Sequence, residues 1–204
     1  MAVSAGRNAV FVDKDGTLVE NVPFNVDPDQ VRLLPGVVDG LQLLRDAGFL
    51  LFVVSNQAGV ALGRFARDAL GGVEARIDAL LAADGVSIDG YAWCPHHPQG
   101  TVADYAAACT CRKPQPGMLQ DLAARHGVAL ERSWMIGDIL DDVEAGHRAG
   151  CRAVLVDRGG ETQWRRGPGR EPDARVDRFD AAARAILSCG RTRPRVSAAL
   201  PLTA

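Results

Sequence analysis

Short apolar segments alternate with amphipathic segments along most of this chain. Continuous apolar runs are typical of strands buried on both faces of a parallel sheet, and they occur at 8–13, 49–54, 88–93, 134–136 and 153–156. Between these runs, apolar residues recur with helical spacing at 35–48, 68–83, 116–126, 141–149 and 180–187. Strands that alternate with helices predict an α/β fold built on a doubly wound, mostly parallel, Rossmann-like sheet.

Polar segments rich in proline and glycine separate these elements. We predict a single domain over residues 1–189, in which the loop at 16–34 overhangs the end of the first strand. No long extra segment follows Thr17 or Gly59, so we expect no large cap domain. The composition of 159–173 predicts a surface loop, and that of 190–204 predicts a mobile C-terminal tail.

Composition and charge narrow the class of protein. The chain has 204 residues, of which 47% are hydrophobic, and this is enough for one globular domain. Its net charge of -2 gives no field that would attract a nucleic-acid backbone or an anionic membrane surface. Its apolar runs are far shorter than the ~18 residues of a membrane span, and the first eight residues lack the apolar core of a secretory leader. We therefore expect a cytoplasmic monomer with no nucleic-acid or membrane partner.

Two carboxylates follow the first predicted strand. Asp13 and Asp15 are separated by one residue, so in an extended backbone both side chains point the same way. Gly16 then allows the chain to turn without steric cost. Carboxylates held together persist in a partly buried site only with a cation or a shared proton, and Mg²⁺ is the candidate cation. A strand-end turn without function is the alternative.

Two further predicted strands end in polar clusters. These clusters are Ser55-Asn56-Gln57, and Gly137-Asp138 with Asp141 and Asp142 shortly after. In an open α/β sheet, ligands bind outside the carboxyl ends of the strands. A strand-terminal serine and additional carboxylates suit a site that grips both a phosphoryl group and Mg²⁺. The three strand ends together predict such a site.

These motifs resemble, in order, those of the haloacid dehalogenase superfamily of phosphatases over about residues 8–156. The matching residues are Asp13-Lys14-Asp15-Gly16-Thr17, Ser55-Asn56, Lys113 and Gly137-Asp138-x-x-x-Asp142. The resemblance implies that Asp13 is a nucleophile that forms an aspartyl-phosphate, and that Asp15 is the general acid and base.

The resemblance also implies roles for the other motif residues. These are substrate contacts for Ser55, Asn56 and Lys113, Mg²⁺ ligation by Asp13, Asp15 and Asp138, and support of that site by Asp142. The residue types suit the chemistry, because a phosphate dianion repels a carboxylate unless Mg²⁺ and a lysine neutralise its oxygens. A catalytically silent binding domain and a polynucleotide end phosphatase are the alternatives. The intact carboxylates argue against the first and the charge balance against the second.

A second cluster of candidate ligands lies in a polar loop at 94–111. Its members are Cys94, His96, Cys109 and Cys111, with His97 as an alternative to His96. Three cysteines and one histidine would make a closed tetrahedral zinc site. Five cysteines in total, three of them in this loop, favour a metal in a reducing compartment over a disulfide framework. Since the protein would fill every coordination position, we expect this zinc to be structural.

The loop sequence resembles that of the D-glycero-D-manno-heptose 1,7-bisphosphate phosphatases. The matching strings are Cys94-Pro95-His96-His97-Pro98-Gln99-Gly100 and Cys109-Thr110-Cys111-Arg112-Lys113-Pro114. The resemblance implies a phosphorylated sugar as substrate, with Arg112 on the phosphate that remains and Lys113 on the one removed. Histidinol-phosphate phosphatases share the zinc pattern and are the nearest alternative. Ile139 departs from the heptose pattern, where a basic residue is usual, and Lys14 replaces the usual arginine as an expected surface or loop cation.

Overall fold

Six parallel strands form one sheet in the computed structural model, which describes residues 6–191. The spatial order is β3-β2-β1-β4-β5-β6, so the first strand lies near the centre. The strands are β1 (Ala9–Val12), β2 (Leu50–Asn56), β3 (Gly90–Cys94), β4 (Trp134–Gly137), β5 (Arg152–Val156) and β6 (Ala174–Val176). The predicted doubly wound parallel sheet is confirmed.

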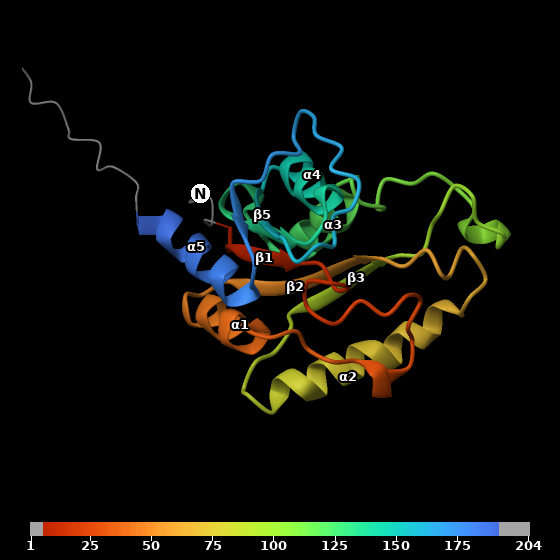
Figure 1. Ribbon diagram of the computed structural model, residues 1–204, viewed down its shortest axis with the longest axis horizontal. Helices are drawn as coiled ribbons and strands as arrows, with labels where there is room; N and C mark the ends of the chain where they lie inside the picture. Colours follow the sequence, from red (N-terminus) through yellow and green to blue (C-terminus); the bar gives the residue numbers. More distant parts are fainter. Residues whose placement is uncertain (1–5, 192–204) are drawn as a thin grey trace, which may run out of the picture.

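Helices cover both faces of this sheet. They are α1 (Val37–Asp46), α2 (Leu70–Ala82), α3 (Gly117–His126), α4 (Leu140–Ala149) and α5 (Phe179–Arg191). Figure 1 shows α3 and α4 on one side of the strands and α1 and α2 on the other. The packing clusters agree, because α1, α2 and α5 share one hydrophobic core and α3 and α4 share the second.

Strand β1 contributes to both cores through the two-residue period of extended backbone. Val10 and Val12 pack with α1, α2 and α5, whereas Ala9 and Phe11 pack with α3 and α4. All four residues are fully buried. Since both faces are covered, no polar residue can alternate with the apolar ones, and the strand reads as a continuous apolar run.

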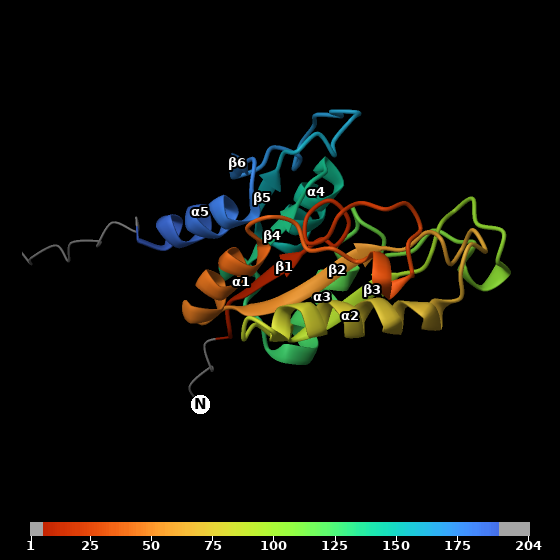
Figure 2. The same cartoon turned by 60° about the horizontal axis from the view of Figure 1, so that its bottom comes forward.

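Strand β1 pairs with β2 on one side and with β4 on the other. From β1 the chain therefore first adds strands toward one edge of the sheet and then, from β4 on, toward the other edge. Connections that leave β1 and β4 toward opposite faces open a crevice at the carboxyl ends of these strands, where α/β proteins bind ligands. Between β1 and α1 the chain forms a loop with one short 3-10 turn, Pro28–Gln30. In Figure 2 this red loop and the green loop that follows β3 extend beyond the strand tips.

One strand and one helix end differ from the sequence-based prediction. Strand β6 was not predicted, because three residues are too few to show a period. Helix α5 extends to Arg191, so the predicted start of the tail at residue 190 falls inside the helix. The rest of the predicted tail, 192–204, lies outside the described residues. Among the described residues, no helix has the length and apolar character needed to cross a membrane.

Candidate active site

Asp13 is positioned by the end of β1. Its backbone N–H donates to the carbonyl of Ile136 at 2.9 Å, which continues the pairing of β1 with β4. Gly16 then turns with φ +84°, and a Cβ at that position would lie 2.3 Å from Oδ2 of Asp138. Glycine is therefore required there both for the left-handed backbone and for close approach to the next strand end.

Three buried carboxylates meet at the ends of β1 and β4. Asp13, Asp138 and Asp142 each offer an oxygen, and these atoms lie within 4.8 Å of one another. The ammonium of Lys113 contacts Asp13, lies 2.6 Å from Oδ1 of Asp142, and donates to the carbonyl of Val54 at 3.0 Å. One lysine thus faces three carboxylates. When all of them are ionised, this buried group carries more negative than positive charge.

The raised pKa values of two of these aspartates reflect the same shortage of positive charge. Burial raises the pKa of Asp13 well above its usual value, an effect that Lys113 opposes and Asp142 and Asp138 reinforce. Burial and the neighbouring Asp142 also raise the pKa of Asp138 to about 7. A divalent cation would remove both penalties, and carboxylate oxygens are the ligands that Mg²⁺ prefers. The donor set therefore fits magnesium.

Asp15 lies beside this cluster rather than in it. Its carboxylate accepts from Lys14 at 2.5 Å and from the side-chain amide of Gln57 at 3.1 Å. The same Gln57 amide donates to Oγ of Ser55 at 2.9 Å, and the Ser55 side chain is buried. Gln57 therefore links the strand-end serine to the second carboxylate.

Asn56 fixes the backbone of Lys113. Its side-chain nitrogen donates to the carbonyl of Lys113 at 3.0 Å, and its side-chain oxygen accepts from the N–H of Lys113 at 2.9 Å. Both polar groups of the amide are thus used within the protein. Since Asn56 ends β2, these bonds tie the segment that carries Lys113 to the edge of the sheet.

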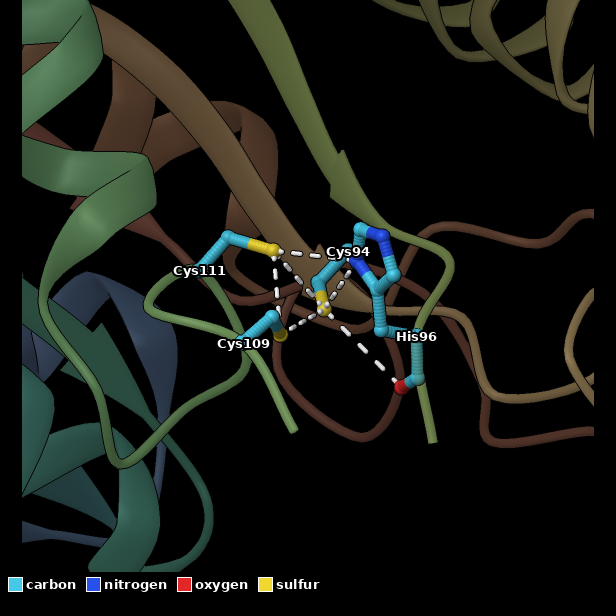
Figure 3. Close-up of side chains that lie close together, drawn as sticks. All are labelled: Cys94, His96, Cys109 and Cys111. Carbon is cyan, nitrogen blue, oxygen red and sulfur yellow. Dashed lines mark hydrogen bonds between the residues drawn. The ribbon is translucent and has the colours of Figure 1, made fainter. Parts of the chain in front are cut away.

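The four predicted zinc ligands also converge (Figure 3). The sulfur atoms of Cys94, Cys109 and Cys111 are separated by 3.2–3.6 Å. Nδ1 of His96 lies 3.4 Å from the sulfur of Cys111 and 3.9 Å from that of Cys94. Zinc–sulfur bonds of ~2.3 Å in a tetrahedron place sulfur ligands about 3.8 Å apart. The donor set and its spacing therefore fit a zinc ion, and His96 rather than His97 faces the cysteines.

Comparisons with known proteins agree with this geometry. Residues 110–182 match the family model described as HAD-hydrolase-like. The chain is 35% identical over 153 residues to a D-glycero-β-D-manno-heptose-1,7-bisphosphate 7-phosphatase of Yersinia pestis, covering 75% of this chain and 81% of that protein. A Rhodopseudomonas palustris protein of the same name is 39% identical over 151 residues, with 74% and 84% covered. The chain belongs to the haloacid dehalogenase (HAD) superfamily of phosphatases.

A solved structure extends the similarity to the fold. The D,D-heptose 1,7-bisphosphate phosphatase of B. bronchiseptica, complexed with magnesium and phosphate, superposes on this HAD phosphatase with a TM-score of 0.73. The two sequences are 29% identical, and the match covers 89% of this chain and 98% of the other.

The structure adds detail to three sequence-based assignments. Asp142 lies in the group of close carboxylates, whereas the Asp15 side chain contacts Lys14 and Gln57, and magnesium ligation by Asp15 stays a prediction. The side-chain amide of Asn56 binds the backbone of Lys113, and its contact with substrate stays a prediction. Lys14 lies in the turn after β1, as expected of a loop cation, but it is only 3% exposed, so the expectation of a surface cation is wrong. The ion pair with Asp15 makes its burial tolerable.

Sequence reasoning assigned no role to two polar residues of the site, Gln57 and Thr17. Gln57 was seen only as part of a strand-end cluster, and it bridges Ser55 and Asp15. Thr17 is buried, and its hydroxyl donates to Oδ1 of Asp138 at 3.4 Å. Thr17 ends the first matching motif and Gln57 directly follows the second, so their positions were the available signal.

Proposed function

We propose that this HAD phosphatase is a magnesium-dependent enzyme that removes the 7-phosphate of D-glycero-D-manno-heptose 1,7-bisphosphate. The observation that carries the proposal is the lysine-bridged carboxylate cluster at the end of β1 and β4, in which Lys113 and three aspartates converge. The substrate is supported by relatives at 35–39% identity that carry this name. A catalytically silent binding domain would not need such a costly buried cluster.

Asp13 is the nucleophile in this proposal. It lies at the carboxyl end of the central strand with its carboxylate against Lys113. Asp13 and Asp138 would hold Mg²⁺. Asp142, in the first turn of α4, would support this site through its ion pair with Lys113. Magnesium bound there would neutralise phosphoryl oxygens that otherwise repel a carboxylate. Lys113 and the Ser55 hydroxyl bind the same phosphoryl group, so Asp13 can attack phosphorus and form an aspartyl-phosphate.

Asp15 transfers protons in both halves of the reaction. Lys14 and Gln57 hold its carboxyl group beside the strand-end serine. From there it protonates the departing sugar oxygen, and it then takes a proton from the water that hydrolyses the aspartyl-phosphate. Asp15 also remains a candidate for magnesium binding, although its side chain faces Lys14.

The Cys94, His96, Cys109 and Cys111 cluster would hold a structural zinc. No coordination position would remain open, so the ion would act on conformation and not on substrate. It would stabilise the residues 94–111, here named the cysteine loop, directly before Arg112 and Lys113. Arg112 donates to the carbonyl of His96 at 3.4 Å and keeps further donors for the phosphate that remains on the sugar. Reduced cysteines and this substrate suit a cytoplasmic enzyme.

Phosphate release from three substrates tests the proposal. Purified protein with Mg²⁺ would be given heptose 1,7-bisphosphate, heptose 7-phosphate and histidinol phosphate under identical conditions. We expect kcat/KM to be highest for the bisphosphate. A preference for histidinol phosphate would establish the alternative substrate and leave the phosphatase chemistry in place. Equal values for both heptose phosphates would remove the role of the second phosphate.

A further inference from the structure

A cavity of about 470 Å³ lies next to the carboxylate cluster. Pro114 and Ile139, which line it, directly follow Lys113 and Asp138 in the sequence. The opposite wall comes from the loop between β5 and β6, which includes Gly160 and Arg165. A volume of this size is within the range of sites for small metabolites. The cavity therefore lies beside the two segments that carry Lys113 and Asp138.

The β5–β6 loop is fixed against the cluster at two points. A Cβ on Gly160 would lie 2.1 Å from Oδ2 of Asp138, so the backbone of the loop passes close to the proposed magnesium ligand. The carboxylate of Glu161 accepts from the backbone N–H of Leu140 at 2.9 Å, at the first residue of α4. These contacts hold the cavity wall in place without a bound ligand.

Pairing within the cavity leaves one cation available. Asp141 is 2.7 Å from Arg170, which also contacts Glu144. Burial would raise the pKa of Glu161, but backbone N–H groups of Leu140, Gln163 and Trp164 outweigh it and hold that pKa below its usual value. The Arg165 guanidinium, exposed at the cavity, has no hydrogen-bond or ion-pair partner among the described residues.

We propose that this cavity binds the sugar and the phosphate that remains on it, and that Arg165 contacts this second phosphate together with Arg112. The inference rests on the proposed function, that the enzyme acts on a sugar bisphosphate. Ile139 gives the cavity an apolar surface on which the carbon face of a sugar can pack, while the satisfied acids Asp141 and Glu161 need no further cation. An unpaired guanidinium offers two parallel donors to a phosphate. Arg165 is thus a specificity residue, separate from the chemistry at Asp13.

Three variants of the full chain test this assignment. Arg165→Ala removes the cation, and Arg165→Lys keeps the charge but not the planar pair of donors. Arg166→Ala is the matched control, because Arg166 is also exposed on this loop but lines a separate cavity of about 100 Å³ with Trp164. Phosphate release would be measured with Mg²⁺ on heptose 1,7-bisphosphate, heptose 7-phosphate, fructose 1,6-bisphosphate and fructose 6-phosphate.

We expect Arg165→Ala to raise KM for the preferred bisphosphate about tenfold more than KM for its monophosphate, as expected for one charged hydrogen bond. Arg165→Lys should recover part of that loss, and Arg166→Ala should leave the ratio of the two KM values at its native value. The inference is overturned if Arg165→Ala changes both KM values equally or behaves like Arg166→Ala.

The assay separates this inference from the proposed substrate. If the native enzyme prefers fructose 1,6-bisphosphate and Arg165→Ala weakens that preference, the heptose proposal fails and the phosphate subsite stands. If the native enzyme prefers heptose 1,7-bisphosphate and Arg165→Ala leaves the preference unchanged, only the subsite fails. A native preference for monophosphates would overturn both.

Discussion

Lys113 is held by both its side chain and its backbone. Its ammonium contacts Asp13, Asp142 and the carbonyl of Val54, and Asn56 binds its backbone N–H and carbonyl. Burial would lower the pKa of Lys113, but the two aspartates together raise it, so the charge is retained throughout the neutral range. A cation fixed in this way needs little reorganisation when a phosphoryl group arrives.

The amide of Asn56 is the first residue to test. Asn56→Ala removes both bonds to Lys113, and we expect a loss of about 1–3 kcal/mol in the free energy of unfolding together with a lower kcat. Urea denaturation and steady-state kinetics measure the two effects. Gln42→Ala is the control, because it removes a similar bond from Gln42 to the carbonyl of Asp84 outside the site. A native kcat in Asn56→Ala would show that the two hydrogen bonds from Asn56 do not position Lys113.

Replacement of the proposed nucleophile should separate chemistry from folding. Asp13→Asn keeps the shape of the side chain but cannot attack phosphorus, so we expect kcat to fall by at least about a thousandfold. The amide carries no buried charge, so the variant should fold and give a native circular dichroism spectrum. Substantial phosphate release by a folded Asp13→Asn protein would assign the nucleophile to another residue.

Sequence spacing predicted which residue types meet, but not which of their atoms are free. Asp13 and Asp138 converge because they follow strand ends of one parallel sheet, and strand ends can be read from apolar runs. Lys113 reaches them from the loop before α3 and was assigned from the family resemblance. The bonds from the Asn56 amide to Lys113 and the burial of Lys14 could not be predicted, because both are set by packing between segments far apart in the chain. Single-residue roles therefore needed the three-dimensional structure.

At the scale of elements, the cysteine loop should depend on its metal. Cys109→Ser removes one of the four converging donors, and we expect the protein to lose its zinc, about one ion per chain. Elemental analysis gives the stoichiometry, and limited proteolysis should show new cleavage within 94–111. Cys151→Ala is a suitable control, since Cys151 is buried outside the cluster. Native protein that contains no zinc and is fully active would refute the structural zinc.

Replacement by alanine should change stability in opposite directions at two helical glycines. A Cβ on Gly40 of α1 would lie 2.6 Å from the ring of Phe179 in α5, so Gly40→Ala should destabilise the protein by about 1–3 kcal/mol. A Cβ on Gly71 of α2 would meet nothing within 4 Å, so Gly71→Ala should stabilise it by about 0.5 kcal/mol. Thermal unfolding of both variants measures the difference. Equal effects would mean that α1 and α5 are not in close contact.

The long elements were predictable and the shortest were not. Helix α1 shows its helical period over ten residues and strand β2 spans seven residues that begin with a continuous apolar run, so their positions agree with the predictions to within about two residues. Strand β6 has three residues and is recognised only by its pairing with β5. That pairing also closes the loop that carries Arg165, so the cavity wall could not be placed from the sequence.

At the scale of the whole molecule, the buried acids couple stability to pH and to magnesium. The pKa of Asp138 is raised to about 7, so in metal-free protein its contribution to stability is present at low pH and lost as pH rises through 7. Magnesium binds the ionised form and should restore stability at high pH. We expect the Mg²⁺-induced rise in Tm to be larger at pH 8 than at pH 5.5.

Thermal unfolding with and without Mg²⁺ measures this coupling. Asp138→Asn is the control, because it removes the titrating group and a proposed ligand together, so the Mg²⁺-induced rise in Tm should become small at both pH values. A rise in Tm that is independent of pH in the native protein would show that magnesium binds elsewhere.

The central place of β1 also has a consequence for synthesis of the chain. Of the six described strands, β1 is synthesised first, yet its two sheet neighbours are β2 and β4, and β4 begins only at Trp134. Until β4 has been synthesised, one edge of Ala9–Val12 has no strand to pair with. Unpaired apolar strand edges promote aggregation of incompletely folded chains. Products that stop before β4 should therefore aggregate, and a soluble, active fragment should require residues through at least Asp142.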